Sequence, residues 1–206
     1  MTTGEVPSVI VYGDADAPHT LDVYEDMRCF YCAILDHELG ETMQGLADSG
    51  TYRIAYHVAN FLDRGDENGG STNALAALGA AAEQGADQFA ALRVALFEYR
   101  REHSSAGLAD PDVIRGIVAQ TPDVDFLAVV KAINEGRFRP WALETGPAAL
   151  ASLRAAWEAA QLPGRAGTPA AFLDGHAVEV LTEQGDPVSA EEFEANVDAA
   201  VAAAKG

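Results

Sequence analysis

The sequence has few basic residues and almost no lysine. Lysine and arginine together account for 13 of its 206 residues, and only Lys131 and Lys205 are lysines. The 32 acidic residues therefore give a formal net charge of −19. Because such a surface repels phosphate groups and anionic lipids, we expect neither nucleic acid nor a membrane as a partner.

Long apolar runs are missing as well. The apolar stretch at 74–82 is far shorter than the roughly 18 residues of a membrane-spanning helix, and it contains Gly79. Residues 1–8 have neither the basic nor the apolar segment of a secretory signal. We therefore expect a cytoplasmic monomer, with the alternative of an exported protein whose leader was removed. With 49% apolar residues, the chain can still bury a substantial core.

Cysteine is nearly absent, and the two cysteines lie close together. Cys29 and Cys32 are separated by Phe30 and Tyr31, a spacing that two randomly placed cysteines would show in about 1% of cases. Zinc needs two more ligands, and the five histidines, at positions 19, 37, 57, 103 and 176, have no second paired spacing. An iron–sulfur cluster needs about four thiolates. The spacing favours a redox-active dithiol without metal, over a zinc site shared in a dimer or two unreactive cysteines.

The surrounding sequence places this dithiol where a strand passes into a helix. Residues 20–24 alternate between apolar and polar side chains, whereas apolar residues from Ala33 to Leu46 recur at helical spacing. The unpaired amide groups at a helix N-terminus stabilise a thiolate, which is the reactive form of cysteine. We therefore expect Cys29 to be reactive and Cys32, one turn further on, to close a disulfide with it.

The order of predicted elements indicates an α/β fold with a helical insertion. Alternating or β-rich stretches predict the strands, which are 9–12, 20–24, 51–58, 168–173 and 177–181. Helical periodicity and capping residues predict helices between the two groups of strands, at 72–85, 87–102, 111–119, 122–135 and 139–161. Gly146–Pro147 is expected to kink or split the last of these. Asp174–Gly175 predicts a hairpin turn, and Ser189 with Glu192 predicts the start of a final helix.

The chain resembles the DsbA-like thiol–disulfide oxidoreductases of the thioredoxin superfamily. The resemblance rests on residues 13–18 (GDADAP), on Cys29-Phe-Tyr-Cys32 and on Gly167-Thr168-Pro169 before a strand. It implies a thioredoxin-like domain, residues 1–62 and 162–206 (β-β-α-β … β-β-α), with a helical insertion domain, residues 63–161. It also implies that Pro169 is a cis-proline forming one wall of a substrate groove, the alternative being a trans loop proline.

Two positions depart from the family pattern. Phe30 replaces the proline that usually follows the first cysteine, and Val23 stands where many relatives have a buried acid. Glu25 and Asp26 are the acids available for proton transfer, but we expect them to be solvated surface groups. Arg28 is expected either to favour the Cys29 thiolate or to balance Asp26.

These observations predict a thiol–disulfide oxidoreductase in which Cys29 attacks and Cys32 resolves. Substrates would be proteins or small thiols, bound by Phe30, Tyr31, Thr168 and Pro169, and a redox partner would recycle the dithiol without an organic cofactor. A metal-binding or redox-sensing module on the same fold is the alternative. A glutathione-dependent isomerase or transferase fits less well because such relatives often lack the second cysteine.

Overall fold

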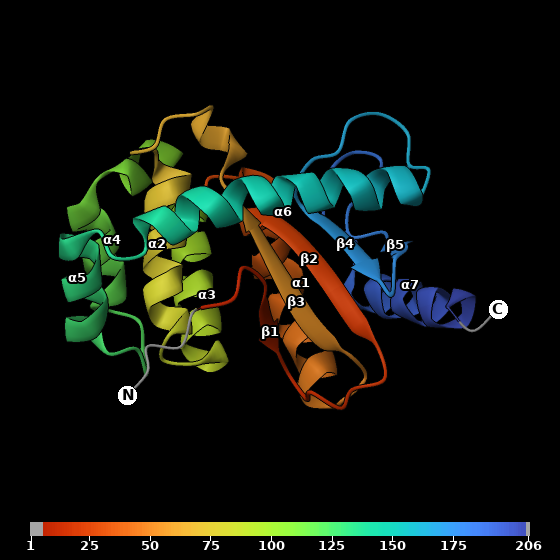
Figure 1. Cartoon of the computed structure of the whole chain (residues 1–206). Helices are drawn as coiled ribbons and strands as arrows, with labels where there is room; N and C mark the ends of the chain where they lie inside the picture. Colours follow the sequence, from red (N-terminus) through yellow and green to blue (C-terminus); the bar gives the residue numbers. More distant parts are fainter. Residues whose placement is uncertain (1–5, 205–206) are drawn as a thin grey trace.

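A five-stranded mixed sheet forms the centre of the computed structural model, which describes residues 6–204 (Figure 1). The strands, in the order β1-β3-β2-β4-β5 across the sheet, are β1 Ile10–Tyr12, β3 Arg53–Ala59, β2 Thr20–Asp26, β4 Ala170–Leu173 and β5 His176–Val178. β2 and β3 are parallel, and every other pair is antiparallel. The predicted thioredoxin-like fold is confirmed.

Helices cover both faces of this sheet. α1 (Phe30–Asp48) joins β2 to β3 and, with α7 (Ala190–Ala203), lies on the opposite face from α6 (Arg139–Ala159) (Figure 1). Alternation along β2 produces the two layers: Leu21 and Val23 belong to the main core with α1, whereas Tyr24 packs with Leu153 of α6. The central strand β2 is therefore buried on both sides.

Five helices lie between β3 and β4, as the sequence predicts. They are α2 (Gly70–Ala82), α3 (Ala86–Glu102), α4 (Pro111–Val118), α5 (Phe126–Glu135) and α6, with 3₁₀ turns at Phe61–Asp63 and Ser105–Ala109. α2 to α5 form a group beside the sheet, and α6 extends from that group across the sheet (Figure 1). The proposed division into domains 1–62 with 162–206 and 63–161 stays a prediction, and residues 1–5 and 205–206 lie outside the described residues.

The helices differ from the sequence-based predictions in detail. α5 begins at Phe126 instead of 122, because Asp125 caps it by accepting a hydrogen bond from the Ala128 amide. The split expected at Gly146–Pro147 is absent, because α6 runs through Pro147 without a break; the expected kink stays a prediction. Pro147 is exposed, so water can bond to the carbonyl that its missing N–H leaves free.

The predicted turn and final helix are confirmed. Asp174 and Gly175 have positive φ angles of 49° and 85°, as a two-residue hairpin turn between β4 and β5 requires. Ser189 caps α7 by accepting from the Glu192 amide, 3.1 Å away. β5 ends at Val178, earlier than predicted, because Leu181 instead pairs with Pro187 in a separate bridge. None of the helices between residues 6 and 204 has the length and hydropathy that crossing a membrane requires.

Candidate active site: the Cys29–Cys32 dithiol

Cys29 is the N-cap residue of α1, directly after β2. Its backbone is extended (φ −70°, ψ 120°), and its amide donates to the Asp26 carbonyl at 2.8 Å. The first amides of α1 thus lie next to the thiol. Cys29 is 8% exposed and Cys32 is 2% exposed, and both thiols are free. The predicted placement at the start of a helix is confirmed, although Cys29 itself is largely buried.

The two thiols have opposite pKa shifts. A hydrogen bond from the Cys32 side chain lowers the pKa of Cys29 to about 7, with further help from the Thr168 hydroxyl and the Cys32 amide; burial opposes the shift. Burial raises the pKa of Cys32 well above its ordinary value, and the neighbouring Cys29 raises it further. The two thiols of such a pair have different roles, because Cys29 supplies a reactive thiolate near neutral pH while Cys32 stays protonated.

Thr168 lies against Cys29. Its carbonyl accepts a hydrogen bond from the Cys29 thiol at 3.3 Å, and its peptide bond to Pro169 is cis. The antiparallel register of β4 on β2, which pairs Ala170 with Tyr24, brings this loop to the end of the strand that leads into the dithiol. The Thr168 hydroxyl oxygen is buried as well. Thr168 and Cys29, far apart in sequence, are therefore one site.

Two aromatic side chains are exposed beside the dithiol. Phe30 is 43% and Tyr31 is 52% exposed, and their rings meet edge to face at 6.2 Å. A 310 Å³ hollow with mostly apolar walls starts at Pro169 and continues over β4 and β5, past Trp157 of α6. The four residues predicted to bind substrate thus lie around the dithiol, with Phe30 and Tyr31 pointing outward and Thr168 inward. Their role in binding stays a prediction.

The expectation that Glu25 and Asp26 are solvated is wrong. Their exposed fractions are 1% and 0%, since both belong to the central strand β2. Glu25 receives hydrogen bonds from Arg93 of α3 at 2.6–2.9 Å, and the same guanidinium binds Asp36 of α1 at 2.5 Å. Burial nevertheless raises the pKa of Glu25. A signal was present in the sequence: Arg93 stands among apolar residues on the buried side of its helix.

Asp26 is satisfied by hydrogen bonds from three segments. Its carboxylate accepts from the amide of Arg28 (2.9 Å), the amide of Leu62 (3.1 Å) and the hydroxyl of Ser71 in α2 (2.6 Å). Burial raises its pKa to about 6 despite these bonds. The negative charge of Asp26 in turn raises the pKa of Cys29. Asp26 is therefore a buried acid that opposes the Cys29 thiolate.

Arg28 does not pair with the Asp26 side chain through its guanidinium. That group binds Asp63 at 3.0 Å and the Leu62 carbonyl at 2.9 Å. Asp63 also accepts from the amides of Ser71 and Thr72, so it holds the beginning of α2. Arg28 thereby ties the active-site loop to the first turn of the helical insertion.

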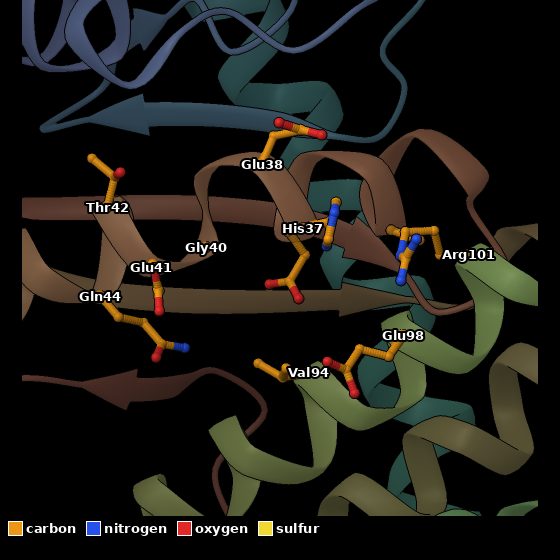
Figure 2. Close-up of a pocket in the computed structure, with 11 residues that line it drawn as sticks. His37, Glu38, Gly40, Glu41, Thr42, Gln44, Val94, Glu98 and Arg101 are labelled. Atoms are coloured by element: carbon orange, nitrogen blue, oxygen red, sulfur yellow. The ribbon is translucent and has the colours of Figure 1, made fainter.

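A larger hollow lies between α1 and α3, away from the sulfur atoms. It has a volume of 470 Å³, and Figure 2 shows acidic side chains and Arg101 around it. His37, on its wall, is exposed. Among residues 6–204, no group of three or more His, Cys, Asp or Glu side chains has the arrangement of a metal site. Within the described residues, the dithiol is therefore the best candidate for an active site.

Comparisons with known proteins agree with this geometry. The family model described as thioredoxin matches residues 5–199. No curated protein matches the sequence. Among solved structures, the MdbA protein of Corynebacterium diphtheriae, a thiol-disulfide oxidoreductase, is 24% identical with a TM-score of 0.69, over 96% of this chain and 92% of that one.

Two other solved structures show the same similarity of fold. MdbA of Corynebacterium matruchotii has a TM-score of 0.70 at 22% identity, over 84% of this chain and 83% of its own. Reduced DsbA of Mycobacterium tuberculosis has a TM-score of 0.69 at 18% identity, over 95% and 93%. The fold is therefore of the DsbA type, and the chain belongs to the thioredoxin family.

Proposed function

We propose that this protein is a thiol–disulfide oxidoreductase in which Cys29 is the attacking thiol and Cys32 the resolving thiol. The observation that carries the proposal is the asymmetry of the pair. Cys29 is at the helix N-terminus with its pKa lowered to about 7, whereas Cys32 is buried with its pKa raised. The thioredoxin family membership supports the same chemistry.

The reaction is a two-step exchange. The Cys29 thiolate attacks one sulfur of a substrate disulfide, forming a mixed disulfide and releasing the other substrate sulfur as a thiolate. Cys32 then loses its proton and attacks the Cys29 sulfur, which releases the second substrate thiolate and closes the Cys29–Cys32 disulfide. Two electrons pass from the dithiol to the substrate, and the reverse sequence oxidises a substrate dithiol. A second thiol–disulfide couple must restore the starting form.

The surface around the dithiol suits a polypeptide substrate. The exposed rings of Phe30 and Tyr31 and the apolar hollow at Pro169 offer contacts to side chains on either side of a substrate cysteine. Thr168 would offer its backbone to an extended segment in the manner of an added strand. We assign substrate binding to these four residues.

Cysteine variants test the assignment of the two thiols. Cys32→Ser should accumulate a mixed disulfide with a model disulfide peptide, detected by mass spectrometry, because nothing resolves the intermediate. Cys29→Ser should react on the order of 100-fold more slowly at pH 7, because the remaining thiol is almost wholly protonated. Both variants should have the far-ultraviolet circular dichroism of the native protein. Faster alkylation of Cys32 than of Cys29 at pH 6 would reverse the assignment.

A further inference from the structure

One side chain of the helical insertion reaches the loop that leads into the dithiol. Arg100, in the last turn of α3, donates from Nε to the Arg28 carbonyl at 2.8 Å and from Nη1 to the His103 carbonyl at 3.1 Å. The central carbon of its guanidinium is 5.2 Å from the ring centroid of Phe30, within the range of a cation–π contact. The insertion therefore touches the residues on both sides of Cys29.

These contacts hold the peptide group before Cys29 at both ends. The carbonyl of that group, from Arg28, accepts from Arg100, and its N–H, from Cys29, donates to the Asp26 carbonyl. The orientation of this peptide group determines the position of Cys29 at the start of α1. Phe30 is the first residue of α1, so the stacked guanidinium also limits where that ring can lie.

The charge of Arg100 is not neutralised by an ion pair within the described part of the chain, whereas Arg28 is paired with Asp63. Burial lowers the pKa of Arg100 and the charge of Arg28 lowers it further, whereas negative charge on Cys29 raises it. By reciprocity, positive charge on Arg100 favours the Cys29 thiolate. The other charged or titratable groups that act on Cys29 are Cys32 in α1 and Asp26 at the end of β2, and the charge of Arg28 acts on Arg100.

We propose that Arg100 is a positioning residue for the reaction of Cys29: it holds the Arg28–Cys29 peptide in place and supplies the positive charge that stabilises the thiolate. The helical insertion thus helps set the redox equilibrium of the dithiol at the start of α1. The proposal rests on the exchange chemistry proposed above for Cys29.

Three substitutions separate charge from structure. Arg100→Gln removes the charge, Arg100→Lys keeps it without the planar stacking group, and Arg101→Gln removes the adjacent charge. Arg101 is the matched control because it pairs with Glu102 on the same helix turn. The pKa of Cys29 is measured from the pH dependence of its alkylation by iodoacetamide, and the dithiol equilibrium is measured against glutathione.

Arg100→Gln should lower the thiolate fraction of Cys29 at pH 6 at least threefold. At a pH well above the Cys29 pKa, where the thiolate dominates the reduced protein, it should also shift the glutathione equilibrium at least threefold towards the oxidised protein, about 14 mV for a two-electron couple. Arg100→Lys should keep at least half of the native effect, and Arg101→Gln should change neither quantity. Added salt should raise the Cys29 pKa of the native protein more than that of Arg100→Gln.

The proposal is overturned if Arg100→Gln leaves the Cys29 pKa and the glutathione equilibrium unchanged, or if Arg101→Gln changes them equally. It also fails if Arg100→Lys behaves as Arg100→Gln does, because the effect would then not follow charge. Failure of the native protein to exchange with glutathione would instead contradict the exchange chemistry, and the alkylation profile would still report on Arg100.

Discussion

Asp26 has an unusual position for an ionisable side chain: it is fully buried, next to the reactive thiol, and bonded to three donors. Burial costs its charged form more than these bonds return, so its pKa rises to about 6. In the unfolded chain an aspartate has a pKa near 3.9. Between these two values the native state binds a proton that the unfolded state has lost.

This difference predicts how stability depends on pH. The contribution of Asp26 to the free energy of unfolding is fully favourable below about pH 4 and declines as the pH rises to about 6. The decline is on the order of 3 kcal/mol, at 1.36 kcal/mol per pKa unit. Asp26→Asn should flatten the free energy of unfolding over this range, as measured by urea denaturation at pH 4 to 7. A variant profile as steep as that of the native protein would show that other groups are responsible.

The location of the two cysteines at the start of a helix was predictable from the sequence, whereas the burial of the neighbouring acids was not. The spacing of Cys29 and Cys32 and the residues around them indicate where a helix begins and which thiol lies at its start. Glu25 becomes buried because Arg93 reaches it from a helix 68 positions later. The residues around Glu25 do not indicate that contact. The one signal is a distant arginine among apolar residues, and nothing in the sequence links it to two adjacent acids in a strand.

At the scale of the elements, Gly79 allows α2 and α6 to approach closely. A Cβ atom built on Gly79 would lie 2.8 Å from Cε3 of Trp141 and 3.0 Å from Cδ1 of Phe138. Both are ring atoms, held in a contact between aromatic side chains whose centroids are 6.4 Å apart. A methyl group at this position requires the rings to shift.

Gly79→Ala should therefore destabilise the protein by about 1–3 kcal/mol, although alanine is the better helix former. Gly45→Ala in α1 is the matched control, since a Cβ there has no neighbour within 4 Å; it should stabilise by up to about 1 kcal/mol. Chemical denaturation of both variants measures the difference. Equal effects at the two sites would mean that the α2–α6 contact relaxes without cost.

The existence and order of the elements followed from periodicity, but several of their ends did not. Strand and helix patterns along the chain predict each β-strand and each helix of the insertion. α5 begins at Phe126 because Asp125 caps it. α6 continues through Pro147 because that residue is exposed to water. Helix ends depend on single hydrogen bonds and on which side faces water, and these become visible only in the folded chain.

Across the whole molecule, the net charge of −19 opposes compaction. Raising the salt concentration from about 10 mM to 150 mM shortens the screening length from about 30 Å to 8 Å. We expect the melting temperature to rise by about 2–4 °C, which corresponds to about 1 kcal/mol for a chain of this size. Near pH 4.4, the isoelectric point, the effect should vanish. A melting temperature that falls with salt at pH 7 would mean that surface ion pairs outweigh the repulsion.

Helix α6 also has an optical consequence. Both tryptophans are on it, Trp141 against Gly79 of α2 and Trp157 at the hollow beside Pro169. Sixteen residues of helix separate them, about 24 Å. The intrinsic fluorescence is therefore the sum of two local signals: one comes from the helical group, and the other from the wall where a substrate would rest. With phenylalanine at either position, the remaining indole would report on a single end of the helix.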